Sequence, residues 1–397
     1  MDKKKILIVY PLMMMGGSTT SLLSLLHNID KEKYEVDLLL YRNTGDLLSE
    51  IPDDVRLLPA TKKYGGRFGK LVKVVILIFS GYLFKGFFAN RKKGKKGCSN
   101  AVLEECQAKY FSRKVKQQYD YAISFLEGWS NRYLAFNVNA DKKYAWIHST
   151  FSKTTDDVKF EKRWIEKVDK VVFVTDACKN EFDVLLPEYA DKSIIVANII
   201  DSTVIRKRAL LIENDESYNN FVNNKKTKIV TVCRITINTK GLDRIVDTVK
   251  NLKADGYEFL WYIIGDGPDK SSLDELISKA DVSDCLVTVG QKMNPYPFIK
   301  EADFMCMPSR YEGKPMVVTE SMILGVPAVV TEYLSAHDQI KHGVEGLVLS
   351  NNDNSLYSAL KALISDKETI NKMKKYLSEN EYGNGEYIEY IQKELFF

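Results

Sequence analysis

Two glutamates eight residues apart, Glu312 and Glu320, are the first residues whose type and spacing indicate a binding site. An ionised carboxylate offers only hydrogen-bond acceptors, so it suits the hydroxyl groups of a sugar or the diol of a ribose. The spacing is about two helical turns, which places Glu312 in a loop and Glu320 one turn inside the following helix. Taken alone, the pair fits a capping acid and a surface acid equally well.

The residues between these glutamates could bind an anion. The apolar run 304–307 predicts a strand, and Gly313 lies in the loop after it. A helix is expected to begin near Met316, so the backbone N–H groups of Met316 and Val317 would be available at its start. Lys314 adds a cation that could contact a phosphate or reach a second substrate.

Two cations follow an earlier apolar run, 229–233. Arg234 comes directly after it, and Lys240 precedes Gly241 and a predicted helix. Because ligands of open α/β sheets lie beyond the carboxyl ends of the strands, these cations could bind a diphosphate. A solvated basic turn is the alternative for this segment alone.

A third turn, at Gly265, follows the apolar run 259–264. Glycine permits a tight turn and a close approach by another part of the backbone, although one such turn is weak evidence. All three clusters follow strands of one predicted sheet, in the order expected for a nucleotide-diphosphate site.

The elements that would position these residues alternate between short apolar runs and helical patterns. The apolar runs are typical of strands buried on both faces, and the alternation predicts parallel sheets covered by helices. A chain of 397 residues exceeds what one core usually organises. The predicted fold class is therefore α/β, with two Rossmann-like doubly wound domains facing a cleft.

A polar segment rich in Asn, Glu, Asp and Lys separates the two alternating regions and is typical of a connection. We predict an N-terminal Rossmann-like acceptor-side domain over 1–205 and a linker over 206–227. A C-terminal Rossmann-like domain over 228–385 would bind a nucleotide. The segment 386–397 could pack back on the N-terminal domain.

The composition, with 45% hydrophobic and 28% charged residues, is that of a globular protein. A net charge of +4 is too small to indicate nucleic-acid binding. The six cysteines form no CxxC pair, and the histidines are not at metal-ligand spacing, so no metal site is predicted. This cysteine usage suits a cytoplasmic protein, and the N-terminal apolar run fits a first strand better than a secretion signal.

The segment 61–103 contains many lysines and arginines, several aromatic residues and no acidic residue. Its uncharged stretch, 74–84, is too short to cross a bilayer, which needs about twenty residues. Such a segment could lie against an anionic membrane surface, peripheral to the inner face of the membrane. A core helix with a solvated basic loop is an equally good interpretation.

In combination, these features resemble a retaining GT-B glycosyltransferase of the family 4 (glycosyltransferase group 1) type. The resemblance rests on Arg234 with 240–242, on the turn 265–268, and on the segment 309–320 followed by 325–327. It covers nearly the whole chain and is strongest from Lys228 to about Leu349.

The resemblance implies roles for these residues. Arg234 and Lys240 would bind the donor diphosphate and stabilise the leaving group, so that neither metal nor cofactor is needed. Glu312 would contact the donor sugar, Glu320 the ribose, and the segment 290–294 the base. The donor-binding residues that it implies are Gly16, Gly17, Arg234, Lys240, Gly265, Lys292, Met293, Glu312, Gly313, Lys314, Met316, Val317 and Glu320.

In the N-terminal domain, His148 matches a histidine that the family places at the cleft floor. It joins Glu312, Arg234 and Lys240 as a catalytic candidate, with a structural histidine as the alternative. His148 is followed by Ser149 and Thr150, whereas many relatives have an acid two residues after the histidine. This difference puts in doubt a role that the histidine would share with an acid.

The function that the resemblance implies is transfer of a hexosyl unit, with retention, from a nucleotide-diphosphate sugar such as a UDP-sugar. The acceptor would be a polysaccharide or a cell-envelope glycan, for example in capsule assembly, and it could be linked to a lipid. A nucleotide-sugar epimerase or hydrolase of the same fold and a non-catalytic partner subunit are the alternatives. A dehydrogenase is disfavoured because no GxGxxG follows either first strand.

Overall fold

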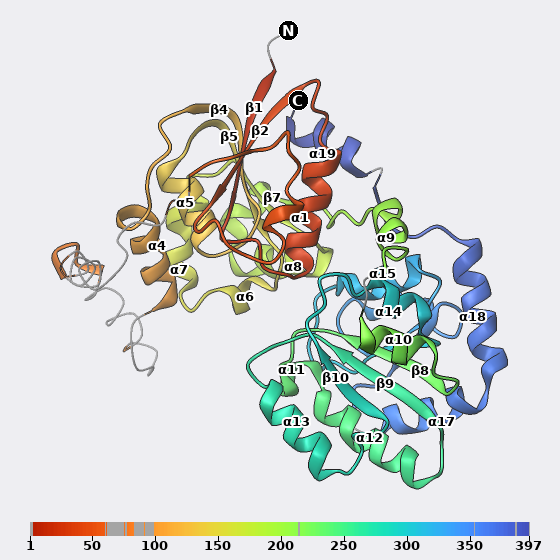
Figure 1. Ribbon diagram of the computed structural model, residues 1–397. Coiled ribbons are helices and arrows are strands. Elements are labelled where there is room, and N and C mark those ends of the chain that lie inside the picture. Colours follow the sequence, from red (N-terminus) through yellow and green to blue (C-terminus); the bar gives the residue numbers. More distant parts are fainter. Residues whose placement is uncertain are drawn as a thin grey trace. The chain divides into compact units, whose positions relative to one another are not determined.

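The computed structural model describes residues 3–59, 61, 75, 78–82, 91, 99–212, 215–352, 354–385 and 387–396. The chain forms two compact units, each described here by itself (Figure 1). Unit 1 comprises Met1–Ile199 together with Glu386–Phe397, and unit 2 comprises Ile200–Gly385. The predicted α/β class and the two parallel-sheet, Rossmann-like domains are confirmed.

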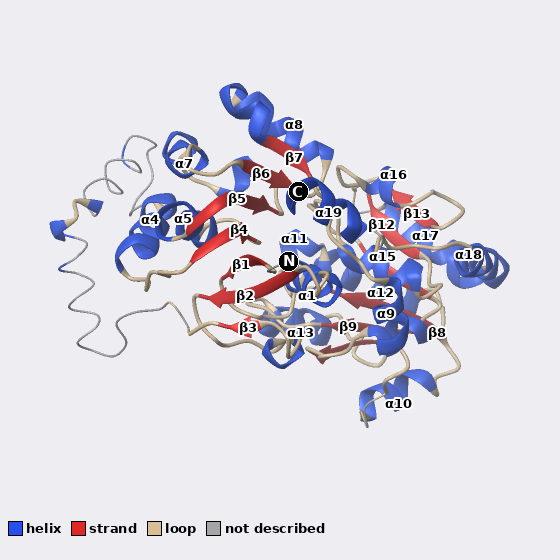
Figure 2. Ribbon diagram, turned by 90° about the horizontal axis from the view of Figure 1, so that it is seen from above, coloured by secondary structure: helices blue, strands red, loops and turns tan. Residues whose placement is uncertain are grey.

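Unit 1 contains a seven-stranded parallel sheet in the order β3-β2-β1-β4-β5-β6-β7, which can be followed in Figure 2. Its strands are β1 (Lys4–Tyr10), β2 (Tyr34–Leu40), β3 (Arg56–Leu57), β4 (Gln118–Ser124), β5 (Asn139–Ile147), β6 (Lys170–Phe173) and β7 (Ser193–Ile195). Its described helices include α1 (Gly17–Asn28), α4 (Asn100–Tyr110), α5 (Trp129–Asn137), α6 (Phe151–Thr154), α7 (Val158–Ile165), α8 (Asp176–Leu185) and α19 (Tyr387–Phe396), with short 3-10 turns at Leu48–Glu50 and Pro187–Lys192. Residues 6–10 of the central strand β1 are all buried, because helices cover both faces of the sheet.

The C-terminal helix α19 packs in unit 1, next to α1 (Figure 1). Ile388, Ile391 and Leu395 lie on one helical face and are buried in the same apolar cluster as α1. The Tyr144 hydroxyl donates a hydrogen bond of 2.6 Å to the carbonyl of Leu395. The last helix of the chain therefore belongs to the core of the unit in which the chain begins.

Unit 2 contains a six-stranded parallel sheet in the order β10-β9-β8-β11-β12-β13. Its strands are β8 (Thr227–Val232), β9 (Phe259–Ile264), β10 (Leu286–Gly290), β11 (Phe304–Met307), β12 (Ala328–Thr331) and β13 (Gly346–Leu349). Its helices include α9 (Ser202–Arg208), α10 (Glu216–Val222), α11 (Ile237–Lys240), α12 (Leu242–Ala254), α13 (Lys270–Lys279), α14 (Tyr296–Glu301), α15 (Met316–Ile323), α16 (Ala336–Gln339), α17 (Ser355–Ser365) and α18 (Lys367–Glu379). The strand order β9-β8-β11 makes three consecutive carboxyl ends neighbours at one edge of this sheet.

The predicted linker over 206–227 is instead part of unit 2, and the boundary between the units falls at residues 199 and 200. Within the segment, Asp215 caps α10 by accepting from the N–H groups of Ser217 and Tyr218. Tyr218 and Phe221, three residues apart on that helix, are buried in the core of unit 2. The polar composition concealed a short amphipathic helix, because a helix this small needs only two apolar side chains to pack.

Most of the basic and aromatic segment 61–103 lies outside the described residues. Among the residues that are described, Phe79 is 86% exposed. Tyr82 is buried against α4, where its hydroxyl donates to Glu105 Oε1 at 2.6 Å. In the described part of the chain, no helix has both the length and the apolar character that a membrane crossing requires.

Candidate functional site

Three loops of unit 2 follow the neighbouring strands β9, β8 and β11 and meet at one edge of its sheet. Glycines allow their backbones to touch. At Gly241, where φ is +63°, a Cβ would lie 2.1 Å from the carbonyl oxygen of Pro308. At Gly265, where φ is +148°, it would lie 1.9 Å from the carbonyl oxygen of Cys233. The predicted close backbone approach at Gly265 is therefore present, and the approach at Gly241 is equally tight.

Arg310 ties the loop after β11 to the one after β8. Its backbone N–H donates to the carbonyl of Thr239 at 2.9 Å, and its guanidinium donates to the carbonyl of Asn238 at 3.0 Å. The guanidinium also makes two hydrogen bonds, of 2.8 and 2.7 Å, to the carboxylate of Asp243. Two contacts to backbone carbonyls and a bidentate ion pair hold the two loops in a defined relation.

The ion pair between Lys240 and Glu312 lies in the middle of this edge. Lys240 Nζ donates to Glu312 Oε1 at 2.6 Å, and the hydroxyl of Ser309 donates to the same oxygen at 2.8 Å. The side chains of Lys240 and Glu312 are only 21% and 11% exposed. The carboxylate is thus held in one orientation by two donors, and the ammonium is partly neutralised.

The second predicted cation, Arg234, differs from Lys240 in its surroundings. It lies two residues after the end of β8 and is exposed. Among the residues that the structure describes, it has neither a hydrogen bond nor an ion pair. Its positive charge is therefore available to an anionic ligand at the same sheet edge.

The start of α15 offers backbone donors. Pro315 precedes the helix, and no side chain caps it. The loop before it is held through its carbonyl oxygens, since Ser335 Oγ donates to Gly313 at 2.5 Å and Gln339 Nε2 donates to Pro315 at 2.9 Å. A Cβ at Gly313 would have no described neighbour within 4 Å, so the space beside this glycine is open. Met316 and Val317 occupy the first turn, and Lys314 is exposed beside it.

Glu320, the predicted ribose carboxylate, is buried inside α15. Burial raises the pKa of its carboxyl group to about 7. A hydrogen bond of 3.2 Å from the hydroxyl of Tyr296 and the nearby positive charge of Arg208 both act to lower that pKa. A carboxyl group with this pKa changes charge near neutral pH.

The loop after β10 carries the two residues predicted to lie near the base. Lys292 forms an ion pair of 2.5 Å with Asp215, the residue that caps α10. Met293 has an exposed side chain, and its carbonyl oxygen accepts a hydrogen bond from Arg208. Both residues thus connect this loop to the segment over 206–227.

Gly16, Gly17 and His148 belong to unit 1. Gly16 caps α1, which begins at Gly17 after the loop that follows β1, and a Cβ at Gly16 would have no described neighbour within 4 Å. His148 follows β5; its Nε2 lies 3.0 Å from the carbonyl oxygen of Phe125, and its buried Nδ1 lies by the side chain of Asn198. Burial lowers the pKa of the His148 ring, and the charge of Glu127 acts in the opposite direction.

Glu127 is a candidate site residue that the sequence prediction missed. It follows β4, and its carboxylate accepts from the N–H of His148 at 3.0 Å and from the hydroxyl of Ser149 at 2.5 Å. An acid therefore does accompany the histidine, but it comes from a neighbouring strand. The signal that could have found it is its place at the end of a predicted strand, where the same rule selected Arg234.

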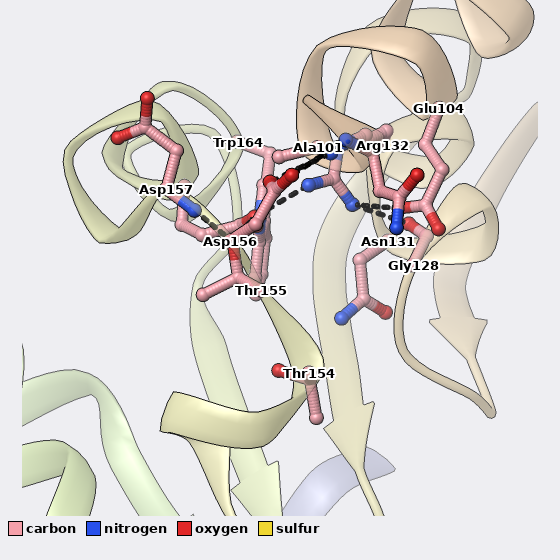
Figure 3. Close-up of polar contacts among 12 residues, drawn as sticks. Ala101, Glu104, Gly128, Asn131, Arg132, Thr154, Thr155, Asp156, Asp157 and Trp164 are labelled. Atoms are coloured by element: carbon pink, nitrogen blue, oxygen red, sulfur yellow. Dashed lines mark hydrogen bonds and ion pairs between the residues drawn. The ribbon is translucent and has the colours of Figure 1, made fainter. Parts of the chain in front are cut away.

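A buried ion-pair network supports the loop that carries Glu127 (Figure 3). Arg132 on α5 donates to the carbonyl of Gly128 at 3.0 Å and to the carboxylate of Glu104 at 2.7 Å. A second arm of the guanidinium donates to Glu161 at 2.5 Å. Gly128 has φ of +85° and leads into α5, so this network fixes the turn directly after Glu127.

The structure brings most of the predicted donor-binding residues of unit 2 onto one edge of its sheet. Glu320 lies behind this edge in the interior, and Lys292 and Met293 follow the adjacent strand β10. The sequence analysis did not single out Arg208, which donates to the carbonyl of Met293, or Tyr296, which donates to the carboxylate of Glu320.

Residues 213–380 match the family described as glycosyl transferases group 1. The amylovoran biosynthesis glycosyltransferase AmsK of Erwinia amylovora is 30% identical over 149 residues, which are 36% of this chain and 36% of that protein. The putative colanic acid biosynthesis glycosyltransferase WcaL of Salmonella typhimurium is 28% identical over 153 residues, 36% of this chain and 37% of WcaL. The chain thus spans little more than a third of the length of these curated relatives.

Among solved structures, Anabaena Alr3699/HepE in complex with UDP and glucose matches 99% of both chains, with a TM-score of 0.67 and 13% sequence identity. WaaG, a glycosyltransferase involved in lipopolysaccharide biosynthesis, matches 98% of this chain and 95% of its own, with a TM-score of 0.60 and 12% identity. At these identities the likeness concerns the fold, and it extends over both units.

Proposed function

We propose, from the membership of residues 213–380 in the glycosyl transferases group 1, that the chain transfers a hexosyl unit from a nucleotide-diphosphate sugar to a glycan acceptor. A UDP-sugar is the donor we favour, because Anabaena Alr3699/HepE was solved with UDP and glucose. A polysaccharide or cell-envelope acceptor accords with the names of AmsK and WcaL.

The observation that carries this proposal is the arrangement of charge at the sheet edge of unit 2. This edge carries Arg234, which is exposed and makes no ion pair with a described residue, Lys240, which is held by Glu312, and the start of α15. Two cations and backbone donors are suited to a leaving diphosphate, whose negative charge grows as the sugar departs.

In the proposed reaction, Arg234 and Lys240 bind the diphosphate, and a hydroxyl of the donor sugar shares the Glu312 carboxylate. No carboxylate is assigned as a nucleophile, so we favour a front-face path with retention, in which the leaving phosphate accepts the proton of the acceptor hydroxyl. Because the protein cations do the neutralising, we propose that the reaction needs no metal.

A panel of nucleotide sugars tests the proposal, first by binding and then by slow hydrolysis of the bound donor. We expect one nucleotide-sugar to bind and to be hydrolysed at the same rate with and without EDTA. Arg234→Ala, Lys240→Ala and Glu312→Ala should each slow turnover by orders of magnitude, and near-normal turnover would refute the assignment. Rapid hydrolysis of the donor, with no sugar transferred when acceptors are added, would favour the epimerase or hydrolase alternative.

We also propose that the basic, aromatic segment 61–103 brings the enzyme to an anionic membrane surface, where a lipid-linked acceptor would lie. Two observations support this proposal: the segment 61–103 contains lysines and arginines but no acidic residue, and Phe79 is exposed. Sedimentation with phosphatidylglycerol vesicles at low salt should retain the protein, and phosphatidylcholine vesicles should not. Equal recovery with both would refute this part of the proposal.

A further inference from the structure

The end of α9 and the loop after β10 are joined by reciprocal hydrogen bonds. The guanidinium of Arg208 donates to the carbonyl of Met293 at 2.9 Å. In return, Asn294 Nδ2 donates to the carbonyl of Arg208 at 2.7 Å and to that of Leu211 at 3.1 Å. The loop proposed to hold the base is therefore fastened to α9, in the segment where the chain enters unit 2.

The same guanidinium lies next to the carboxylate proposed to hold the ribose. Its central carbon is 5.3 Å from the centre of the Tyr296 ring, a distance at which a cation is attracted to the ring. The hydroxyl of Tyr296 donates to Glu320 Oε1 at 3.2 Å. Tyr296 and Glu320 are both buried, and Tyr296 contacts the guanidinium through its ring and the carboxylate through its hydroxyl.

We propose that Arg208 is a positioning residue for the nucleoside end of the donor, which holds the base-side loop through Met293 and acts on the Glu320 carboxylate through its charge and through the ring of Tyr296. This rests on the proposed function, in which Glu320 accepts from the ribose diol. One side chain then positions two parts of the nucleoside site. Its removal should weaken nucleotide binding more than it slows the chemical step.

The electrostatic surroundings of Glu320 support this role. Burial is the largest effect and raises the carboxyl pKa to about 7. Two described groups lower this pKa, Tyr296 from α14 and Arg208 from α9. The elements α18 and β12 also pack on α15, but none of their described groups lowers the pKa of Glu320. Without Arg208 the pKa of Glu320 would rise further. A larger fraction would then be protonated at pH 7, and a protonated carboxyl is a poorer acceptor for two hydroxyl donors.

Calorimetric titration with UDP between pH 6 and 9 tests the proposal without needing the donor sugar. At pH 7 we expect Arg208→Met to weaken UDP binding about tenfold, as expected for loss of a charge-assisted hydrogen bond. The pH at which binding reaches half its maximum should move upward. Arg208→Lys should restore much of the pH dependence, because it restores the charge.

Two controls separate the positioning role from a general loss of structure. Lys207→Met removes an exposed cation one residue earlier on α9, where it makes no ion pair with a described residue, and it should bind UDP like the wild type. In a Glu320→Gln background, Arg208→Met should no longer shift the pH dependence but should still weaken binding through the loop. Thermal unfolding checks that each variant is folded, and the neutral variant Arg208→Gln replaces Arg208→Met in the test if Arg208→Met is not.

Unchanged UDP affinity and an unchanged pH profile in folded Arg208→Met would overturn the inference and leave the proposed function intact. A shift in pH dependence that persists in the Glu320→Gln background would also overturn it, because the charge would then act on another group. A wild-type protein that binds neither UDP nor any nucleotide sugar of the panel would instead refute the proposed function.

Discussion

The ion pair of Lys240 and Glu312 shows how individual residues prepare the candidate site. Each partner holds the other in place before any ligand is bound, and Ser309 adds a second donor to the same carboxylate oxygen. Loss of either charge leaves the other partly buried and without its counter-ion, which is costly. The two residues should therefore behave as one unit when they are mutated.

Lys240→Met and Glu312→Gln are each expected to reduce kcat/KM for the donor by at least two orders of magnitude. The double variant should lose little more than either single variant, because both remove the same unit. Steady-state kinetics measures these effects. Lys270→Met is the matched control, since Lys270 pairs with Asp274 on α13 at a more exposed position. Additive losses in the double variant would show that the two residues act independently.

Glu320→Gln is expected to stabilise the protein at high pH. Burial raises the carboxyl pKa to about 7 in the folded state, above its usual 4.5. The folded protein therefore binds the proton more tightly than the unfolded chain, so stability is lost progressively between about pH 4.5 and 7, by up to roughly 3 kcal/mol in all. Gln keeps the acceptor for Tyr296 without the charge.

Thermal unfolding of wild type and Glu320→Gln at several pH values measures this difference. The variant should have the higher Tm at pH 8, and its advantage should shrink as the pH falls through 7 toward 5. A Tm difference that does not depend on pH would contradict the raised pKa of this carboxyl group.

At the scale of elements, the site depends on loops that approach one another more closely than a side chain would allow. The loops after β8 and β11 touch at Gly241 and Pro308, and those after β8 and β9 touch at Cys233 and Gly265. In each case the neighbour is backbone, which cannot move aside as a flexible side chain can. The positions of Lys240 and Glu312 therefore depend on these glycines.

Gly241→Ala is expected to destabilise unit 2 by about 3 kcal/mol, from a positive φ combined with a backbone clash. UDP binding should weaken as well, because Lys240 precedes this residue. Gly256→Ala is the control: Gly256 has φ of +80°, but a Cβ there would have open space, so only about 1 kcal/mol of backbone strain is expected. Denaturant titration measures both, and equal costs would show that the clash with Pro308 is relieved easily.

At the scale of the whole molecule, the chain closes the core of unit 1 with its last helix. α19 places Leu395 in a cluster with residues of β1 and α1, far away in the sequence. Every predicted donor-binding residue except Gly16 and Gly17 lies in unit 2. Damage to α19 should thus affect the stability of one unit and leave nucleotide binding by the other unchanged.

Leu395→Ala is expected to cost about 3 kcal/mol of unit 1 stability, as for other large-to-small changes in a core. Tyr390→Ala, on the exposed side of the same helix, should cost less than about 1 kcal/mol. Differential scanning calorimetry should show one transition at lower temperature for Leu395→Ala, while its UDP affinity at 25 °C equals that of the wild type. A lower affinity would show that the two units are coupled.

Several elements could be predicted closely from the sequence. The runs 259–264 and 304–307 coincide with β9 and β11. Each is a parallel strand buried on both faces, which makes it a continuous apolar run that local pattern reveals. The short strands β3 and β13 and the helix α10 escaped prediction, because few side chains of each are buried and the local signal is weak.

The sequence by itself determined the fold class and the chemistry available at the strand ends, since both depend on local pattern and residue type. Only the tertiary structure decided which of those residues meet. Lys240 and Glu312 are 72 positions apart and pair because β8 and β11 are neighbours in the sheet. The burial of Glu320 beside Tyr296 and Arg208 likewise depends on how α9, α14 and α15 pack, which no single segment of the chain encodes.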